Sequence, residues 1–163
     1  MIYVVDTNFF IQAHRVYYPL DIFNSFWNEI TRLAANGTII SIDKVQNEIY
    51  RNEDDLKLWC ESNLPNDFFK SSENLISDYT QLVQWVNSGS IQYRDTAKSE
   101  FLDVNEADAW LIAYCMKHGN TLITYEKSDP NIKKKVKIPE PANHFKVKYH
   151  DTIELLRQSG STI

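Results

Sequence analysis

Two acidic residues stand where buried strands are expected to end. Asp6 directly follows the apolar, β-branched run 2–5, and Glu126 follows the run 121–124 by two residues. Because the carboxyl ends of parallel strands meet at one edge of a sheet, where ligands bind in α/β proteins, both side chains are expected there. Asp129 can replace Glu126 or support it. The structural alternatives are a helix cap for Asp6 and a solvated loop position for Glu126.

A third carboxylate, Glu48, lies in a segment with helical spacing. Val45, Glu48 and Ile49 fall on one helix face, and the two apolar residues indicate that this face points at the sheet. A carboxylate on a buried face needs a partner, because isolated burial is costly or raises its pKa. The structural alternative is an ion pair with Lys44 or Arg51.

A fourth carboxylate, Asp108, begins the most apolar helical segment. Its neighbours one turn on are Leu111 and Ile112, so it projects along the buried face. The helix dipole favours an acid in the first turn but does not offset full desolvation. Asp103 and Glu106 have a structural explanation, because the segment between them resembles a capping box. Asp108 has none, which favours a functional role.

Taken together, the four acids predict a site for a hard divalent cation. Carboxylates within about 4–6 Å of one another repel and raise each other's pKa, and a bound cation relieves that repulsion. Oxygen ligands favour Mg²⁺ or Mn²⁺. The histidines and cysteines lack the spacing of metal ligands: His14, His118, His144, His150, Cys60 and Cys115. A dinucleotide fingerprint, a P-loop and a serine-hydrolase elbow are also missing, so these enzyme classes are excluded.

Short apolar runs alternate with longer segments of helical periodicity along the chain. Strands are expected at 2–5, 38–42 and 121–124, with possible further strands at 136–138 and 145–147. Helices are expected at 20–35, 54–61, 74–87, 105–118 and 153–157. Asp43 can cap one more helix, with Gln46 completing a capping box. This alternation predicts an α/β sandwich around a mostly parallel sheet.

The length and composition are those of one globular domain. The chain has 163 residues, of which 43% are hydrophobic and 24% charged. No repeat or linker divides it, so a single domain over 1–163 is predicted. Within that domain, residues 54–102 are expected to form a helical insertion between the second strand and the long apolar helix.

Charge is distributed unevenly along the chain. The net charge is −5, yet residues 127–149 hold seven lysines against two acidic residues. An acidic body with a basic segment is compatible with a cation site beside a phosphate-binding edge. The alternative is a solvated, lysine-rich loop.

The sequence gives no indication of export or of membrane insertion. No apolar stretch approaches the roughly 20 residues of a membrane span, and the first residues lack the basic start of a signal peptide. Two cysteines are too few for a disulfide framework. A cytoplasmic location with no membrane partner is therefore expected.

Four segments resemble the PIN-domain family, which includes the VapC-type toxins of bacterial toxin–antitoxin pairs. The resemblance spans about residues 2–147. It is carried by Val4-Val5-Asp6-Thr7-Asn8, by Glu48, by Glu106-Ala107-Asp108-Ala109-Trp110-Leu111-Ile112-Ala113, and by Leu122-Ile123-Thr124-Tyr125-Glu126. The order and spacing of these segments make the resemblance specific, although each motif is short.

The resemblance implies a three-layer α/β/α domain and a ribonuclease that uses Mg²⁺ or Mn²⁺. The family's metal-binding and catalytic acids fall on Asp6, Glu48, Asp108 and Glu126. Thr7 and Asn8 match polar residues that support the first aspartate. The last acidic position is commonly aspartate, so Glu126 departs from the pattern and Asp129 stays an alternative. RNA, an antitoxin protein and a second copy of the chain are the implied partners.

Two other functions keep the same acids. One is a PIN-like module that binds a protein or nucleic acid without cleaving it, and the other is a metal-dependent phosphatase for small phosphate esters. Under the nuclease reading, an exposed aromatic side chain such as Tyr93 or Tyr125 is a candidate for stacking on a base.

Overall fold

A five-stranded, wholly parallel sheet lies at the centre of the protein. The computed structural model describes residues 1–163, and the strands are ordered β3-β2-β1-β4-β5. Their bounds are β1 Tyr3–Val5, β2 Ile39–Ile42, β3 Phe69–Lys70, β4 Thr121–Ile123 and β5 Tyr149–His150. Tyr3 pairs with Ile39 on one side and Thr121 on the other. The connections diverge on the two sides of β1, so the crevice beyond its carboxyl end is the expected ligand site.

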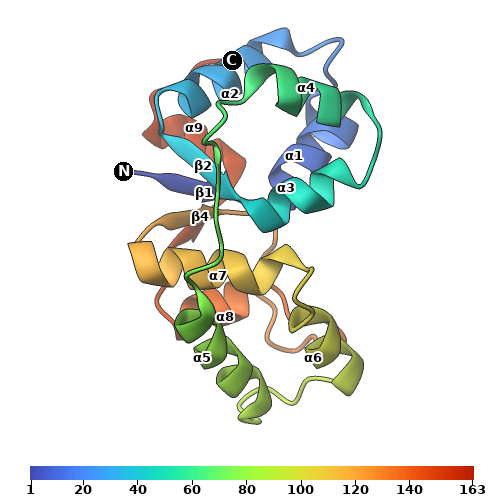
Figure 1. Ribbon diagram of the computed structural model, residues 1–163, viewed down its shortest axis with the longest axis vertical. Coiled ribbons are helices and arrows are strands. Elements are labelled where there is room, and N and C mark those ends of the chain that lie inside the picture. Colours follow the sequence, from blue (N-terminus) through green and yellow to red (C-terminus); the bar gives the residue numbers. More distant parts are fainter.

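Helices cover both faces of the sheet and complete a three-layer α/β/α sandwich (Figure 1). One layer holds α1 Thr7–Gln12, a π-helical turn η1 Ala13–Tyr17, α2 Asn24–Ala35, α3 Asp43–Tyr50, α4 Asp55–Asn63 and α9 Thr152–Gln158. The other holds α5 Ile76–Asn87, α6 Asp95–Phe101, α7 Ala107–His118 and α8 Pro139–His144. The predicted fold class is confirmed. None of these helices has the length and apolar character that crossing a membrane requires.

The core fixes the two helices at whose starts Asp6 and Asp108 lie. Phe9, Phe10 and Phe26 are fully buried between the sheet and its first helical layer. Burial of each such ring stabilises the fold by roughly 1.5–3 kcal/mol, so α1 is held firmly against the end of β1. On the opposite face, Trp110 of α7 stacks on Tyr79 of α5 with ring centroids 4.1 Å apart. The apolar character of α7 thus reflects burial against both the sheet and α5.

The expected strands at 136–138 and 145–147 are wrong. The intervening residues form the short helix α8, with Pro139 at its start, and the last strand is β5 at Tyr149–His150. Val136, Ile138 and Val147 are apolar because they are buried, although they lie outside the sheet. The segment 54–102 is not purely helical either, because β3 within it pairs with β2 and forms one edge of the sheet.

Helix starts were predicted several residues too early in places. The helix expected from residue 20 begins at Asn24, and the one expected from residue 105 begins at Ala107. Asp43 is the first residue of α3 rather than its cap, so the predicted capping box with Gln46 does not form. Instead, the Asp43 carboxylate accepts a hydrogen bond from the Ser72 amide at 3.1 Å, which ties α3 to the segment after β3.

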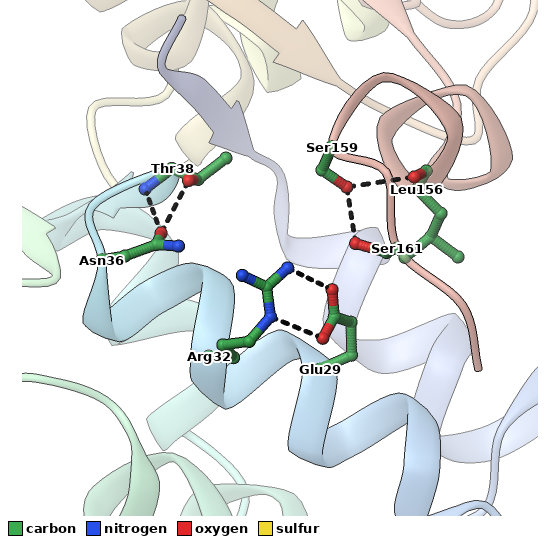
Figure 2. A network of polar contacts seen from close by, with 7 residues as sticks. All are labelled: Glu29, Arg32, Asn36, Thr38, Leu156, Ser159 and Ser161. Atoms are coloured by element: carbon green, nitrogen blue, oxygen red, sulfur yellow. Dashed lines mark hydrogen bonds and ion pairs between the residues drawn. The ribbon is translucent and has the colours of Figure 1, made fainter.

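A polar network secures the surface of α2 and the end of the chain (Figure 2). Arg32 donates two hydrogen bonds to Glu29, at 2.8 and 2.5 Å. Asn36 accepts from both the amide and the hydroxyl of Thr38, which shapes the turn between α2 and β2. The Arg32 guanidinium is the main reason that the pKa of Glu29 lies below its ordinary value. We call the Glu29–Arg32 contact the surface pair.

Candidate functional site

Asp6 connects β1 to α1 and keeps one carboxylate oxygen unpaired. Its Oδ1 accepts a hydrogen bond from the Phe9 amide at 2.7 Å, so the predicted helix-capping role is real. Its Oδ2 has no hydrogen-bond partner, although the residue is only 1% exposed. Burial raises the pKa of Asp6 to about 7, with Glu126 and Glu48 adding to the rise and Thr124 and the Phe9 amide opposing it. Helix capping therefore uses only one of the two carboxylate oxygens of Asp6.

Glu48 joins three helices. Its Oε1 accepts a hydrogen bond from the Ala107 amide at 2.7 Å, at the start of α7, and its Oε2 accepts one from the Thr7 hydroxyl in α1. The carboxylate thus caps α7 from α3, where the helix dipole favours negative charge. Val45 and Ile49 are buried, as the helix-face pattern predicted.

The alternative ion pair for Glu48 is wrong. Lys44 lies over the Trp110 ring at 5.2 Å, and Arg51 donates to the Asn105 carbonyl at 3.1 Å. Arg51 also approaches Glu106, with 3.8 Å between the charged atoms.

Asp108 is the second residue of α7 and lines the same cleft as Asp6 and Glu48. The pKa of Asp108 is raised well above its ordinary value, mainly by burial. The negative charges of Glu126, Asp6 and Glu48 raise it further, and Lys135 lowers it. The structure therefore brings Asp108 into the electrostatic field of the three other predicted acids.

Glu126 is neither solvated nor free. Lys135 donates to its Oε1 at 2.6 Å, and the Ile138 amide donates to its Oε2 at 2.7 Å. The Glu126 side chain is only 10% exposed. Lys135 therefore neutralises the charge of Glu126 locally. The same carboxylate raises the pKa of Asp6 and of Asp108.

Asp129 does not reach this group. Its carboxylate accepts a hydrogen bond from the Asn131 amide at 3.1 Å, and its own amide donates to Glu140 at 2.9 Å. The side chain thus shapes the loop in which it lies. Of the two candidates for the fourth acid, the structure places Glu126 beside the others.

Asp6, Glu48 and Asp108 line a cleft of about 360 Å³, which we call the acid cleft. Glu126 does not line it, although its ion-pair partner Lys135 does. The acid cleft is lined by eleven residues, which are Asp6, Thr7, Asn8, Ile11, Glu48, Arg51, Asn52, Glu100, Glu106, Asp108 and Lys135. Thr7 was predicted to support Asp6, but its hydroxyl bonds to Glu48 instead. The cleft lies at the carboxyl edge of the sheet, where the strand ends predicted it.

Three charged residues of the cleft were missed as parts of a site. Glu106 was interpreted as half of a capping box, yet Asp103 caps the Asn105 amide and the Glu106 side chain caps nothing. Burial and Glu48 raise the pKa of Glu106. Lys135 was noticed only as one of many lysines, and Glu100 carried no signal because α6 sets its position.

The donor set of the acid cleft suits a hard cation, although its side chains are not arranged as a finished metal cage. No group of three or more His, Cys, Asp and Glu side chains has the geometry to hold a metal ion. Glu48 and Glu126 use both oxygens in hydrogen bonds within the protein. Asp6 Oδ2 is the buried oxygen left without a partner, and oxygen donors are those that Mg²⁺ and Mn²⁺ prefer.

The sequence matches the family described as Domain of unknown function (DUF4411) over residues 3–163. The chain belongs to the DUF4411 family. No curated protein matches the sequence of this DUF4411 domain.

Among solved structures, the DUF4411 domain is similar to the crystal structure of VapBC2 from Rickettsia felis bound to a DNA fragment from their promoter. The TM-score is 0.55 and the sequence identity 15%, and the match covers 93% of this chain and 98% of the other. Because the identity is low, this similarity shows the fold alone. The fold is PIN-like, as the sequence motifs indicated.

Proposed function

We propose that this protein is a metal-dependent endoribonuclease and the toxin of a toxin–antitoxin pair. The observation that carries the proposal is the unpaired Oδ2 of Asp6, a buried oxygen in a cleft that Asp108 and Glu48 share. A buried acid with a strongly raised pKa in a cleft is typical of a functional site. The cleft also lies at the strand-order switch beyond β1, where α/β folds bind ligands.

Asp6 and Asp108 are the residues proposed to hold the ion. Glu48 positions them, because it links α1, α3 and the start of α7 through its two hydrogen bonds. Glu126 would be a further ligand if its hydrogen bond with Lys135 were broken. Thr7 and Asn8 also line the acid cleft. A bound Mg²⁺ or Mn²⁺ would polarise the phosphodiester and activate water for in-line hydrolysis. Arg51 and Lys135 offer positive charge to the phosphates in the same cleft.

The proposed partners follow from the fold. The similar structure is a VapBC complex with promoter DNA, which supports an antitoxin protein as the partner of this chain. A homodimer and a cytoplasmic location belong to the same proposal.

The proposal is tested by incubating the purified protein with single-stranded RNA and Mn²⁺. The wild type is expected to cleave the RNA, leaving 5′-phosphate ends, and EDTA is expected to stop it. Asp108→Asn is expected to lose at least about 10³-fold in rate, because an amide cannot replace the charge that holds a cation. Glu29→Gln, in the surface pair, is the matched control and should cleave like the wild type. Undiminished cleavage by Asp108→Asn would remove that residue from the mechanism.

A binding module that does not cleave is the second candidate, and one observation favours it. Each carboxylate oxygen of Glu48 and Glu126 already accepts a hydrogen bond within the protein, so two of the four acids have structural roles. Such a module would bind RNA or a protein without Mn²⁺-dependent turnover.

A chromogenic phosphate ester in the same assay tests for phosphatase chemistry, which a nuclease would not perform.

A further inference from the structure

A second cavity is lined by the end of α1, the turn η1, the segment after β4 and the start of α9. It has a volume of about 380 Å³ and is lined by Gln12, Tyr17, Tyr18, Tyr125, Lys127, Asp151, Thr152 and Ile153. Asp151 caps α9, because its carboxylate accepts a hydrogen bond from the Glu154 amide at 2.9 Å. We call this cavity the aromatic pocket. Tyr17 and Tyr125 stack with ring centroids 5.3 Å apart at 23°, although they come from distant parts of the chain. Tyr17 is 48% exposed, so the ring is open to a ligand as well as to Tyr125.

Packing against the hydrophobic core holds the aromatic side chains of the pocket in place. Tyr18 stacks on the buried Phe26 with centroids 4.0 Å apart, which anchors the chain just after the π-helical turn η1. Tyr17 is the last residue of that turn, and π-helical turns are frequent at functional sites. The pocket is therefore a preformed feature whose aromatic faces need no rearrangement.

Two polar groups of the aromatic pocket are candidates for ligand contacts. Thr152 is only 1% exposed and lines the pocket; its hydroxyl has no hydrogen bond of normal geometry, although it lies near enough to the Tyr125 hydroxyl to lower the pKa of that group. Lys127 contributes an exposed cation to the lining, and its side chain makes no ion pair. Aromatic faces, a hydroxyl and a cation together match a nucleotide, which carries a π-face, polar edges and a phosphate.

The aromatic pocket and the acid cleft are neighbours along two elements. Tyr125 directly precedes Glu126 after β4, and Ile11 of the cleft directly precedes Gln12 of the pocket in α1. Burial raises the pKa of Tyr125 to about 12, and the negative charge of Asp6 adds a small part of that rise. A strand of nucleic acid that crosses the carboxyl edge of the sheet would meet both sites within a short length.

We propose that the aromatic pocket binds one unpaired base of a single-stranded RNA, and that the adjoining phosphodiester lies in the acid cleft. The inference rests on the proposed function, to which it adds a binding site for a base of the substrate. Stacking on Tyr17 holds the base, Thr152 contacts its polar edge, and Lys127 neutralises a phosphate. Of the candidate aromatic residues, Tyr93 is buried and takes no part, whereas Tyr125 forms the inner wall.

The test is binding of two fluorescent hexanucleotides in EDTA, which prevents metal-dependent cleavage. One is hexaadenylate, and the other has the same ribose-phosphate backbone without bases. The wild type is expected to bind hexaadenylate more tightly. Tyr17→Ala is expected to weaken binding of hexaadenylate about 5- to 100-fold and to leave binding of the abasic strand unchanged. Tyr17→Phe, which keeps the ring, should bind like the wild type.

Two control variants separate stacking from other effects. Val16→Ala changes a residue that is 64% exposed in the same turn and lies outside the pocket, so it should bind both strands normally. Lys127→Ala should weaken both strands equally and reduce the salt dependence. The proposal is overturned if the wild type binds both strands equally or not at all. The proposal is also overturned if Tyr17→Ala weakens binding of both strands equally, or of neither strand. Either result would be expected if the pocket binds a peptide instead of a base.

Failure of this inference is distinguishable from failure of the proposed function. If Mn²⁺-dependent cleavage occurs but Tyr17→Ala binds hexaadenylate normally, the proposed nuclease function is supported and the proposed base-binding site is wrong. If base-dependent binding needs Tyr17 but no RNA is cleaved, the base site stands and the nuclease falls.

Discussion

The surface pair and the acid cleft treat carboxylates in opposite ways. Glu29 receives two hydrogen bonds from Arg32, and its pKa lies below the ordinary value (Figure 2). Asp6 is buried with one oxygen unpaired, and its pKa rises to about 7. Glu29 thus has a positively charged partner within the fold, whereas Asp6 has none.

The difference makes the acid cleft the candidate functional site. A buried carboxylate without full pairing destabilises a protein, so a sequence under selection for stability alone would replace it. Local conflicts of this kind are concentrated at functional sites, where a ligand resolves them. The acid cleft is thus the part of the molecule where we propose that an external cation binds.

The largest expected effect comes from Asp6→Asn, which keeps a good helix-capping residue and removes the charge. The folded-state pKa of Asp6 is about 7 against an ordinary 3.8, so the folded state binds this proton more tightly than the unfolded state. Wild-type stability therefore falls as pH rises from about 4 to about 7. At pH 8 the variant should be more stable by about 2–4 kcal/mol. Denaturant unfolding across this pH range measures the difference.

That gain should shrink as the pH falls and vanish near pH 4. A variant that is less stable than wild type at pH 8 would contradict the account of Asp6 as an unpaired buried charge.

Lys135→Met tests the only cation bonded to the four acids. The substitution leaves the Glu126 carboxylate nearly buried without its ion pair, with only the Ile138 amide still bonded to it. Because the lysine is partly exposed, the expected loss of stability is about 1–3 kcal/mol, below that of a fully buried pair. Thermal unfolding in EDTA measures it. Lys134→Met, which alters an exposed neighbour, is the matched control.

Glu48→Gln should have a smaller effect on stability. The amide oxygen still accepts one hydrogen bond, but the favourable charge at the start of α7 is lost. The expected cost is about 0.5–1 kcal/mol at low salt. Because the variant also removes one of the charges that raise the pKa of Asp6, the fall of stability between pH 4 and 7 should become shallower. An unchanged pH profile would show that Glu48 does not act on Asp6.

The smallest effect is expected at the surface pair. Glu29→Gln should leave the melting temperature within about 2 °C of wild type, because the Arg32 side chain is 54% exposed and solvent and salt screen the pair, although the Glu29 side chain is only 13% exposed. Its pH dependence has the opposite sign to that of Asp6. A carboxylate with a lowered pKa stabilises the fold above its ordinary pKa, so the small cost should disappear in acid. A cost that grows in acid would contradict this contrast.

The sequence predicted the edge of the sheet where the acids gather, because short apolar runs followed by polar residues mark strand ends. It therefore predicted β1, β2 and β4 and the placement of Asp6 and Asp108. The two-residue strands β3 and β5 carry no pattern of their own, because their pairing depends on neighbouring strands. Their positions follow from tertiary contacts that periodicity does not encode.

Long-range bonds explain the rest of what the sequence missed. Lys135 is one lysine among seven between residues 127 and 149, and only the folded loop brings it to Glu126. The Tyr17–Tyr125 stack likewise joins residues that lie far apart in the sequence. The residues of the site were thus predictable from strand ends and helix faces, whereas their bonding partners were not.

The central claim is that Asp6 and Asp108 hold a divalent cation, and thermal unfolding with and without Mn²⁺ tests it most directly. At a Mn²⁺ concentration about 100 times the dissociation constant, the wild type should melt about 5–10 °C higher. The double variant Asp6→Asn, Asp108→Asn should show no such rise, while Glu29→Gln should match the wild type. A wild type that Mn²⁺ does not stabilise, or a double variant that it stabilises equally, would contradict the account.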